Sequence, residues 1–402
     1  MKKSQWLVVS VPQAERVESP VARPEWPLGD VRDLGDVRAL QPPSPPVSPK
    51  SPVSPRSPLL RTALSGLVLA LLALAAPAQS LDDADLAARI DRSVDRGLEY
   101  LASRQKANGA YDGGHGDTAA ITALAGMAFL SKGHLPGEGQ YGENINRSLD
   151  YVLTRADSNG YFGNNGQMYA HCIATLFLSE ASGMVDATRQ RKLDAALAKA
   201  VKIILDAQTM RKSAQHQGGW RYSPTATDSD MSCSGWALMA LRSSRLNGGG
   251  VPPQAISDAV EYVKRHSNKD TGSFGYQDAN AYGPTLTGAG ILCLELCGQH
   301  NDPISLRGAS YLMKNFRDLP NSGRCFYGLY YTAQGLFQLG GESWKTFSTW
   351  MYDTFIPLQK GDGSWDKGEE SSAYQTAMCI LAFTVPYRQL PIYQRDETVD
   401  EK

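Results

Sequence analysis

The sequence lacks the features that would assign a function at once. Its 402 residues carry 40 Lys and Arg against 41 Asp and Glu, for a net charge of -1. This balance gives no indication of a nucleic-acid partner, because such proteins offer phosphates an excess of basic residues. The chain contains no P-loop, no Gly-x-Ser-x-Gly, no HExxH and no dinucleotide-binding fingerprint. The enzyme classes that these motifs mark are therefore not indicated.

Cysteine is also scarce and scattered. The six residues are Cys172, Cys233, Cys293, Cys297, Cys325 and Cys379. None forms a CxxC pair, and a chain of this length does not depend on a disulfide scaffold. Cys293 and Cys297 are one helical turn apart, which is typical of small core residues.

Long apolar runs are absent except near the N-terminus. Residues 1–58 are rich in Pro and Ser, a composition that cannot bury enough apolar surface to fold, so we expect disorder. Residues 59–78 carry a basic residue, an apolar run of about 14 residues and Ala76-Pro77-Ala78. This pattern predicts a signal peptide cleaved after Ala78 and export to the periplasm or cell envelope. The alternative is a retained anchor, in which 62–78 associates with the membrane, although the run is short for a span.

What the sequence does contain is a repeat of about fifty residues. Six times, a glycine is followed closely by an aromatic residue. The aromatic residues are Tyr111, Tyr161, Trp220, Phe274, Phe326 and Trp365. Each leads into a stretch rich in Ala, Leu, Met and Gly with few charges, which is typical of a helix buried on most sides.

More charged, amphipathic stretches lie between these apolar ones and predict outer helices. They cover 83–104, 143–155, 187–208, 253–266, 303–315 and 342–358. The first and last repeats are no more polar than the middle ones, so an open solenoid with polar capping repeats is not indicated. We therefore predict an all-α fold over 82–386, an α6/α6 toroid of six helical hairpins around a central cavity. Residues 387–402 would form a C-terminal tail.

The pattern Gln-x-x-x-Gly-x-aromatic carries a family resemblance. It occurs in 105-QKANGAY-111 and 359-QKGDGSW-365 and resembles the repeats of squalene cyclases and protein prenyltransferase β subunits. The resemblance covers roughly residues 82–386. It implies the same toroid and a structural role for the repeat residues, with the Gln tying a helix end to the next turn.

The resemblance also implies two chemistries, and the complete motif of neither is present. Aligned with the zinc ligands of prenyltransferases, Asp230 matches the Asp, but Ser232 replaces the Cys and Gln375 the His. No metal site and no other cofactor are therefore expected. The Asp-x-Asp-Asp-Thr-Ala motif of the cyclases corresponds to 228-DSDM-231, which keeps two aspartates and has Met231 in the fourth place.

The catalytic candidates are Asp230, Asp228 and His171. Asp230 could act as an acid, with His171 as its partner, and each residue also has a structural interpretation. Aspartates at this point commonly cap a helix, and a buried His is commonly held by hydrogen bonds. Side chains near the inner-helix starts are expected to line the cavity, although aromatic residues there also commonly pack. They are Asp117, Tyr169, Trp236, Tyr282, Tyr330, Tyr331 and Tyr374.

Three functions remain open. The first is a non-catalytic or divergent toroid that binds a protein, glycan or lipid, which predicts a filled or shallow centre and aspartates bonded to helix N–H groups. The second is a terpenoid-cyclase-like enzyme acting on an isoprenoid or other apolar chain, which predicts a deep apolar cavity with Asp230 at its wall. The third is a polysaccharide-lyase-like toroid, in which Arg221 and Arg324 would contribute to a basic cleft. The incomplete motifs favour the first.

Overall fold

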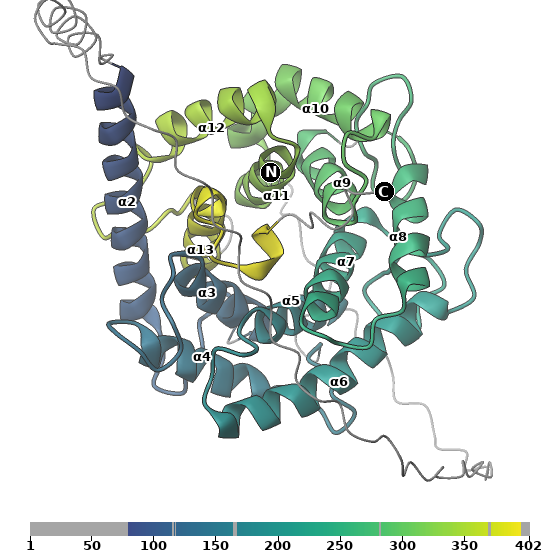
Figure 1. The fold of residues 1–402 in the computed structure, drawn as a ribbon, viewed down its shortest axis with the longest axis horizontal. Helices are drawn as coiled ribbons and strands as arrows, with labels where there is room; N and C mark the ends of the chain where they lie inside the picture. The colour runs from purple at the N-terminus through teal and green to yellow at the C-terminus, as the bar shows by residue number, and fades with distance from the viewer. Residues whose placement is uncertain are drawn as a thin grey trace, which may run out of the picture. The chain divides into compact units, whose positions relative to one another are not determined.

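Twelve α-helices make up the described part of the chain, and they alternate between an outer and an inner ring (Figure 1). The computed structural model describes residues 79–114, 116, 118–163, 167–280, 283–368 and 371–394, all within one compact unit, Leu74–Lys402. The Pro/Ser-rich segment 1–58 and the signal or anchor segment 59–78 lie outside these residues. A β-bridge joins Ser267 to Phe274, and the described residues form no strand.

The helices follow the predicted alternation. The outer helices are α2 (Gln79–Arg104), α4 (Gly142–Thr154), α6 (Ala187–Thr209), α8 (Pro253–Arg265), α10 (Pro303–Asn315) and α12 (Gly341–Phe355). The inner helices are α3 (Ala119–Ser131), α5 (Gln167–Glu180), α7 (Met231–Leu246), α9 (Pro284–Leu296), α11 (Cys325–Leu339) and α13 (Ser372–Phe383).

Residue composition decides which ring a helix joins. In the inner helix α9 every residue from Thr285 to Leu296 is buried, as expected of a helix with few charges. In the outer helix α8, buried Ile256, Ala259 and Val263 recur every three or four residues and form one face. None of the described helices has the length and apolar character needed to cross a membrane.

The inner ring closes on itself. Consecutive inner helices pack against one another from α3 to α13, and α13 also packs against α2 and α3, the first helices of the described residues. Figure 1 shows the closed circle of inner helices within the outer ones. The predicted α6/α6 toroid is therefore confirmed.

The inner helices all start on one face of the ring, which we call the mouth. The N–H of Met168, at the start of α5, donates to the carbonyl of Tyr222, just before α7, over 3.0 Å. The N–H of Met231 at the start of α7 donates to the carbonyl of Tyr276 before α9 over 2.8 Å. The starts of α5 and α7 are thus each bonded to the turn of the next repeat, which sets neighbouring inner-helix starts side by side.

The repeat glutamines clasp neighbouring repeats together, as the resemblance implied. Gln359 Nε2 donates to the carbonyls of Gly363 and Ser93, each over 2.8 Å, and Ser93 Oγ donates to Gln359 Oε1 over 3.0 Å. This clasp joins the last turn to the first helix and so fastens the closure of the ring. Equivalent pairs of bonds run from Gln105 to Gly109 and Asn144 and from Gln208 to Gly218 and Ala255.

Replacing Gly363 with Ala is expected to weaken this closure. Gly363 has φ +88°, and an added Cβ would lie 2.2 Å from the carbonyl oxygen of Arg96. The left-handed conformation and the clash together should cost about 2–5 kcal/mol. Urea unfolding measures the loss, and Gly361→Ala is the matched control, because its Cβ meets nothing within 4 Å. Equal stability of the two variants would contradict the clasp.

The fifth repeat departs from the predicted pattern. The turn expected at Phe326 is absent, because Cys325 begins α11 and Phe326 lies inside that helix, packed 6.0 Å from the Phe355 ring. A 3₁₀ helix, η1 (Phe316–Asn321), makes the connection instead. The prediction of a turn at Phe326 is wrong, because a Gly shortly before an aromatic residue also occurs at the start of a buried helix.

The end of the ring opposite the mouth is covered by the C-terminal strap, residues 385–394. It contains two 3₁₀ turns, η2 (Val385–Tyr387) and η3 (Pro391–Tyr393), and Figure 1 shows this yellow segment lying within the ring. Gln338 Nε2 donates to the Tyr393 carbonyl over 2.9 Å, and the Tyr393 hydroxyl donates to the Leu381 carbonyl over 3.1 Å. Part of the expected tail, 387–394, is thus packed against the inner helices, and 395–402 lies outside the described residues.

Candidate functional site

Asp230 lies immediately before α7 and is fully buried. Its Oδ1 accepts from the Cys233 N–H over 2.8 Å and so caps the helix, and its Oδ2 accepts from Arg221 Nη1 over 2.7 Å. Burial raises the pKa of the Asp230 carboxyl, and the Cys233 amide and Arg221 oppose that rise. Both oxygens accept from N–H donors, an arrangement that fits the ionised carboxylate and not an acid with a proton to give.

Arg221 pairs with the second aspartate as well. Its Nε lies 3.2 Å from Asp228 Oδ2, which also accepts from Gln277 Nε2 over 3.0 Å. The Arg221 side chain is 19% exposed and that of Asp228 is 43% exposed, so Asp228 forms the outer edge of the group. One guanidinium and two carboxylates give a net charge of -1 (+1 for Arg221, -2 for Asp228 and Asp230).

Two partly exposed tyrosines, Tyr222 and Tyr276, contact Arg221, and partly exposed Tyr169 packs beside Tyr222; we call these three residues the tyrosine platform. The guanidinium carbon lies 4.2 Å from the Tyr222 ring centroid and 5.4 Å from that of Tyr276. The hydroxyls of Tyr222 and Tyr276 are hydrogen-bonded, and the Tyr169 and Tyr222 rings lie 5.8 Å apart at 30°. The platform therefore joins residues of three successive repeats at the mouth.

Sequence reasoning named only one member of the platform. Tyr169 was selected because it lies at an inner-helix start, whereas Tyr222 and Tyr276 were missed. A signal for them does exist, because each stands two residues after a repeat aromatic, in 220-WRY-222 and 274-FGY-276. This position follows the turn and precedes the helix, which places it at the mouth.

His171 is turned away from the mouth and held on both sides. Nδ1 accepts from the Phe162 N–H over 3.2 Å, and Nε2 lies 3.0 Å from the Ala200 carbonyl of α6. Burial lowers the pKa of His171 to about 4, so the ring is neutral near pH 7. In four other repeats a hydroxyl accepts the corresponding bond from the N–H group of the repeat aromatic residue. The pairs are Thr122 with Tyr111, Ser234 with Trp220, Thr287 with Phe274 and Thr376 with Trp365. His171 thus fills a structural place that a hydroxyl fills in other repeats.

The aromatic residues deeper in the ring pack on one another. Trp236 and Tyr330 stack with centroids 5.4 Å apart, and Tyr331 meets the Trp236 ring edge-on at 5.4 Å. These three side chains are 2%, 2% and 0% exposed, which leaves no water-sized space beside them. At these three residues the expected central cavity is occupied by packed aromatic rings.

The other residues predicted to line the cavity or a basic cleft lie in different places. Asp117 and Tyr282 lie outside the described residues. Tyr374 is partly exposed in the first turn of α13, and Arg324 lies exposed just before α11. Within the described part of the chain, no three His, Cys, Asp or Glu side chains gather as a metal site would require.

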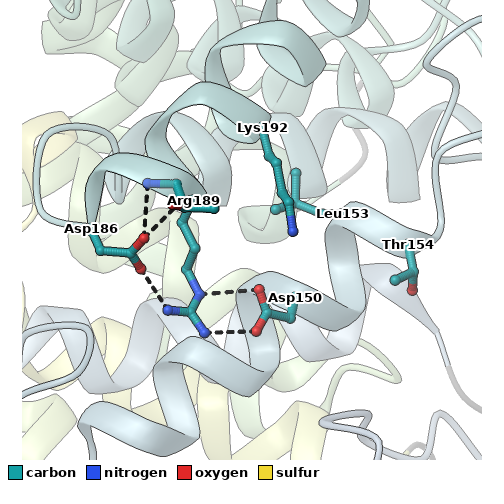
Figure 2. A pocket seen from close by; sticks show the side chains of 7 residues that line it. Asp150, Leu153, Thr154, Asp186, Arg189 and Lys192 are labelled. Atoms are coloured by element: carbon teal, nitrogen blue, oxygen red, sulfur yellow. Dashed lines mark hydrogen bonds and ion pairs between the residues drawn. The ribbon is translucent and has the colours of Figure 1, made fainter.

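A hollow of about 370 Å³ lies between the outer helices α4 and α6, away from the mouth (Figure 2). Arg189 spans it, with Nε and Nη2 bonded to Asp150 over 3.1 and 2.8 Å and Nη1 bonded to Asp186 over 2.7 Å. Asp186 Oδ1 also caps α6 by accepting from the Arg189 N–H over 3.0 Å. Asp150, Asp186 and Arg189 are thus occupied in joining α4 to α6, which gives these three side chains a structural role.

Comparison with known proteins supports the fold. No protein-family model matches the chain, and no curated protein matches it. An inactive variant of the α-1,6-mannanase GH76A of Salegentibacter sp. HEL1_6, in complex with α-1,6-mannotetrose, matches at TM-score 0.57 and 12% identity, covering 73% of this chain and 98% of that one. The type II terpene cyclase MstE from Scytonema, with merosterolic acid A, matches at TM-score 0.52 and 14% identity, covering 76% and 99%. The chain is an α/α toroid. Identities this low say nothing of its activity.

Proposed function

We propose that this chain is a non-catalytic toroid that binds its ligand at the mouth. The observation that carries the proposal is the pairing of both candidate aspartates with Arg221, at 2.7 Å for Asp230 and 3.2 Å for Asp228. A general acid needs a proton to donate in its resting state, and Asp230 is bonded only as an acceptor cap and ion-pair partner. The tyrosine platform beside it supplies the partly exposed surface that a ligand would contact.

The terpenoid-cyclase alternative has less support. Such chemistry needs an apolar chain held against aromatic faces within reach of an acid. The aromatic faces of Trp236, Tyr330 and Tyr331 are instead occupied by one another, with at most 2% of each side chain exposed. The fold neighbours do not decide between ligands, since one holds a mannooligosaccharide and another a terpenoid product.

The polysaccharide-lyase alternative also has less support. A cleft for uronates needs cationic side chains that are available to the ligand carboxylates. Arg221, the basic residue at the platform, already pairs with two carboxylates of its own chain.

A turnover assay tests the proposal. The purified protein is incubated with polyprenyl diphosphates, squalene and α-1,6-mannooligosaccharides, and products are sought by mass spectrometry. We expect no turnover by the wild type, because no described carboxyl at the mouth is poised to donate a proton. Turnover by the wild type that disappears in Asp230→Asn would overturn the proposal and establish Asp230 as the acid.

A further inference from the structure

We infer that the ligand of the mouth is an uncharged oligosaccharide that packs on the tyrosine platform. This inference rests on the proposed function, and it adds the chemical class of the ligand. Tyr169, Tyr222 and Tyr276 each combine a flat apolar ring with a polar hydroxyl, and all three are partly exposed. A sugar presents the same combination, with apolar C–H faces and hydroxyls at the edges, so the two surfaces are complementary.

The ion pairs at the platform favour an uncharged ligand over a charged one. Arg221 is bonded to Asp230 at 2.7 Å, to Asp228 at 3.2 Å and to the Tyr276 hydroxyl at 2.7 Å. Its cationic charge is already paired before a ligand arrives, so the guanidinium is not available to bind an anionic ligand. A cationic ligand would have to compete with Arg221 for the same two carboxylates.

Polar groups at the edge of the platform fit a polyhydroxylated ligand. The 43% exposed side chain of Asp228 receives bonds from Arg221 and Gln277 on Oδ2, so Oδ1 is open to accept from a sugar hydroxyl. The side chain of Gln277 is partly exposed beside it. A chain of isoprene units offers no hydrogen bond to either group, and its binding would leave both desolvated at a cost.

The rigidity of the platform also suits sugar binding. Arg221 holds the rings of Tyr222 and Tyr276 by contacts of 4.2 and 5.4 Å to their centroids, and a hydrogen bond joins the two hydroxyls. Aromatic rings held in place lose little conformational entropy when a ligand binds. The ion-pair group is therefore a support that orients the rings, a role that two carboxylates and an arginine can fill without catalysis.

Isothermal titration calorimetry against three kinds of probe tests the ligand class. The neutral oligosaccharides are α-1,6-mannotriose, cellotriose, maltotriose and chitotriose. Oligogalacturonate is the anionic sugar, and detergent-dispersed geranylgeraniol is the isoprenoid. We expect binding of at least one neutral oligosaccharide and of neither other probe. Tyr222→Ala should weaken that binding roughly tenfold or more, because a central aromatic contact is lost. Tyr222→Phe keeps the ring and should stay within about threefold of the wild type. Tyr311→Ala, on the outer helix α10, is the control and should not change affinity.

The outcomes separate this inference from the proposed function. Binding of oligogalacturonate or geranylgeraniol that is lost in Tyr222→Ala would leave a binding toroid with a different ligand class and overturn the sugar assignment. Sugar binding that is unaffected by Tyr222→Ala would also overturn it, because the ligand would then lie elsewhere. Failure of every neutral oligosaccharide to bind overturns the inference as well. Turnover of a bound sugar would overturn the non-catalytic function and leave the ligand class standing.

Discussion

Replacement of Arg221 by Met is expected to destabilise the toroid by about 3–5 kcal/mol, the usual cost of leaving a buried charge without its partner. The Asp230 side chain is 0% exposed and that of Arg221 is 19% exposed, so water cannot readily substitute for the guanidinium. The helix-capping bond from Cys233 remains, but it alone does not neutralise the carboxylate. Chemical denaturation at pH 7 measures the loss as a fall in the free energy of unfolding.

Two further variants make this expectation specific. Arg221→Met combined with Asp230→Asn removes both charges and should recover stability to within about 1–2 kcal/mol of the wild type, since a neutral pair in place of a buried ion pair is often tolerated. Arg189→Met, at the exposed ion pairs between α4 and α6, should cost much less, because its carboxylate partners are about half exposed. A double variant no more stable than Arg221→Met would show that lost packing, and not the stranded charge, causes the effect.

The ring itself was predictable because every repeat contributes the same local signals. An apolar stretch, an amphipathic stretch and a Gly-aromatic turn recur in phase, and each specifies a helix or a turn without reference to distant residues. The side on which a helix lies follows from its charge pattern. The clasp at Gln359 was implied by family resemblance, and its bond to Ser93, 266 residues away, follows once the ring closes.

The site was less predictable, because its contacts depend on which repeats become neighbours. Tyr222 and Tyr276 are 54 residues apart and meet only when two successive turns lie side by side. The sequence alone also does not reveal that Arg221 folds back to Asp230, which changes that aspartate from a candidate acid into a paired cap. The interaction depends on the conformation of the loop before α7, and no periodic pattern in the sequence predicts that conformation.

His171 illustrates a different limit. Its position early in α5 suggested an inward-facing side chain, whereas its ring points to the outer helix and bonds to the Ala200 carbonyl. One side of an inner helix faces the centre of the toroid and the other side faces the outer helices. Neighbouring residues differ in direction by about 100°, so a shift of one residue can exchange these environments. Alignment of the repeats by their hydroxyl acceptors would have assigned the residue correctly, because Thr122 and Ser234 make the same bond.

Ionisation of Glu180 is expected to lower the free energy of unfolding as pH rises, and this is the second large effect. This side chain at the end of α5 is fully buried under the C-terminal strap. Ser243 Oγ donates to its Oε1 over 2.5 Å, and the Ile392 N–H donates to its Oε2 over 3.1 Å. Burial raises the pKa of Glu180 to about 7, which Ser243 and the Ile392 amide oppose. The neighbouring hydroxyls of Tyr330 and Tyr393 have raised pKa values and stay neutral over this range.

The sign of the effect follows from proton binding in the two states. The unfolded chain releases the Glu180 proton near its ordinary pKa of 4.5, whereas the folded chain keeps it until about pH 7. Between these values the folded state binds more protons, so the stabilisation is complete below the lower pKa and is lost as pH rises through the higher one. A shift of this size corresponds to about 3 kcal/mol.

Glu180→Gln isolates this contribution, because the amide has no proton to lose and keeps a similar shape. We expect the free energy of unfolding of the wild type to fall by about 3 kcal/mol relative to the variant between pH 4.5 and pH 8. Titration of other groups, including His171, affects both proteins equally and cancels in the difference. The protection factor of the Ile392 amide, which removes the base catalysis of exchange common to both proteins, should fall above pH 7 in the wild type alone, because ionisation of the buried carboxyl favours opening of the strap. Parallel pH profiles for the two proteins would mean that Glu180 has the same pKa folded and unfolded, and that the strap is held by its apolar contacts at Leu390, Ile392 and Tyr393.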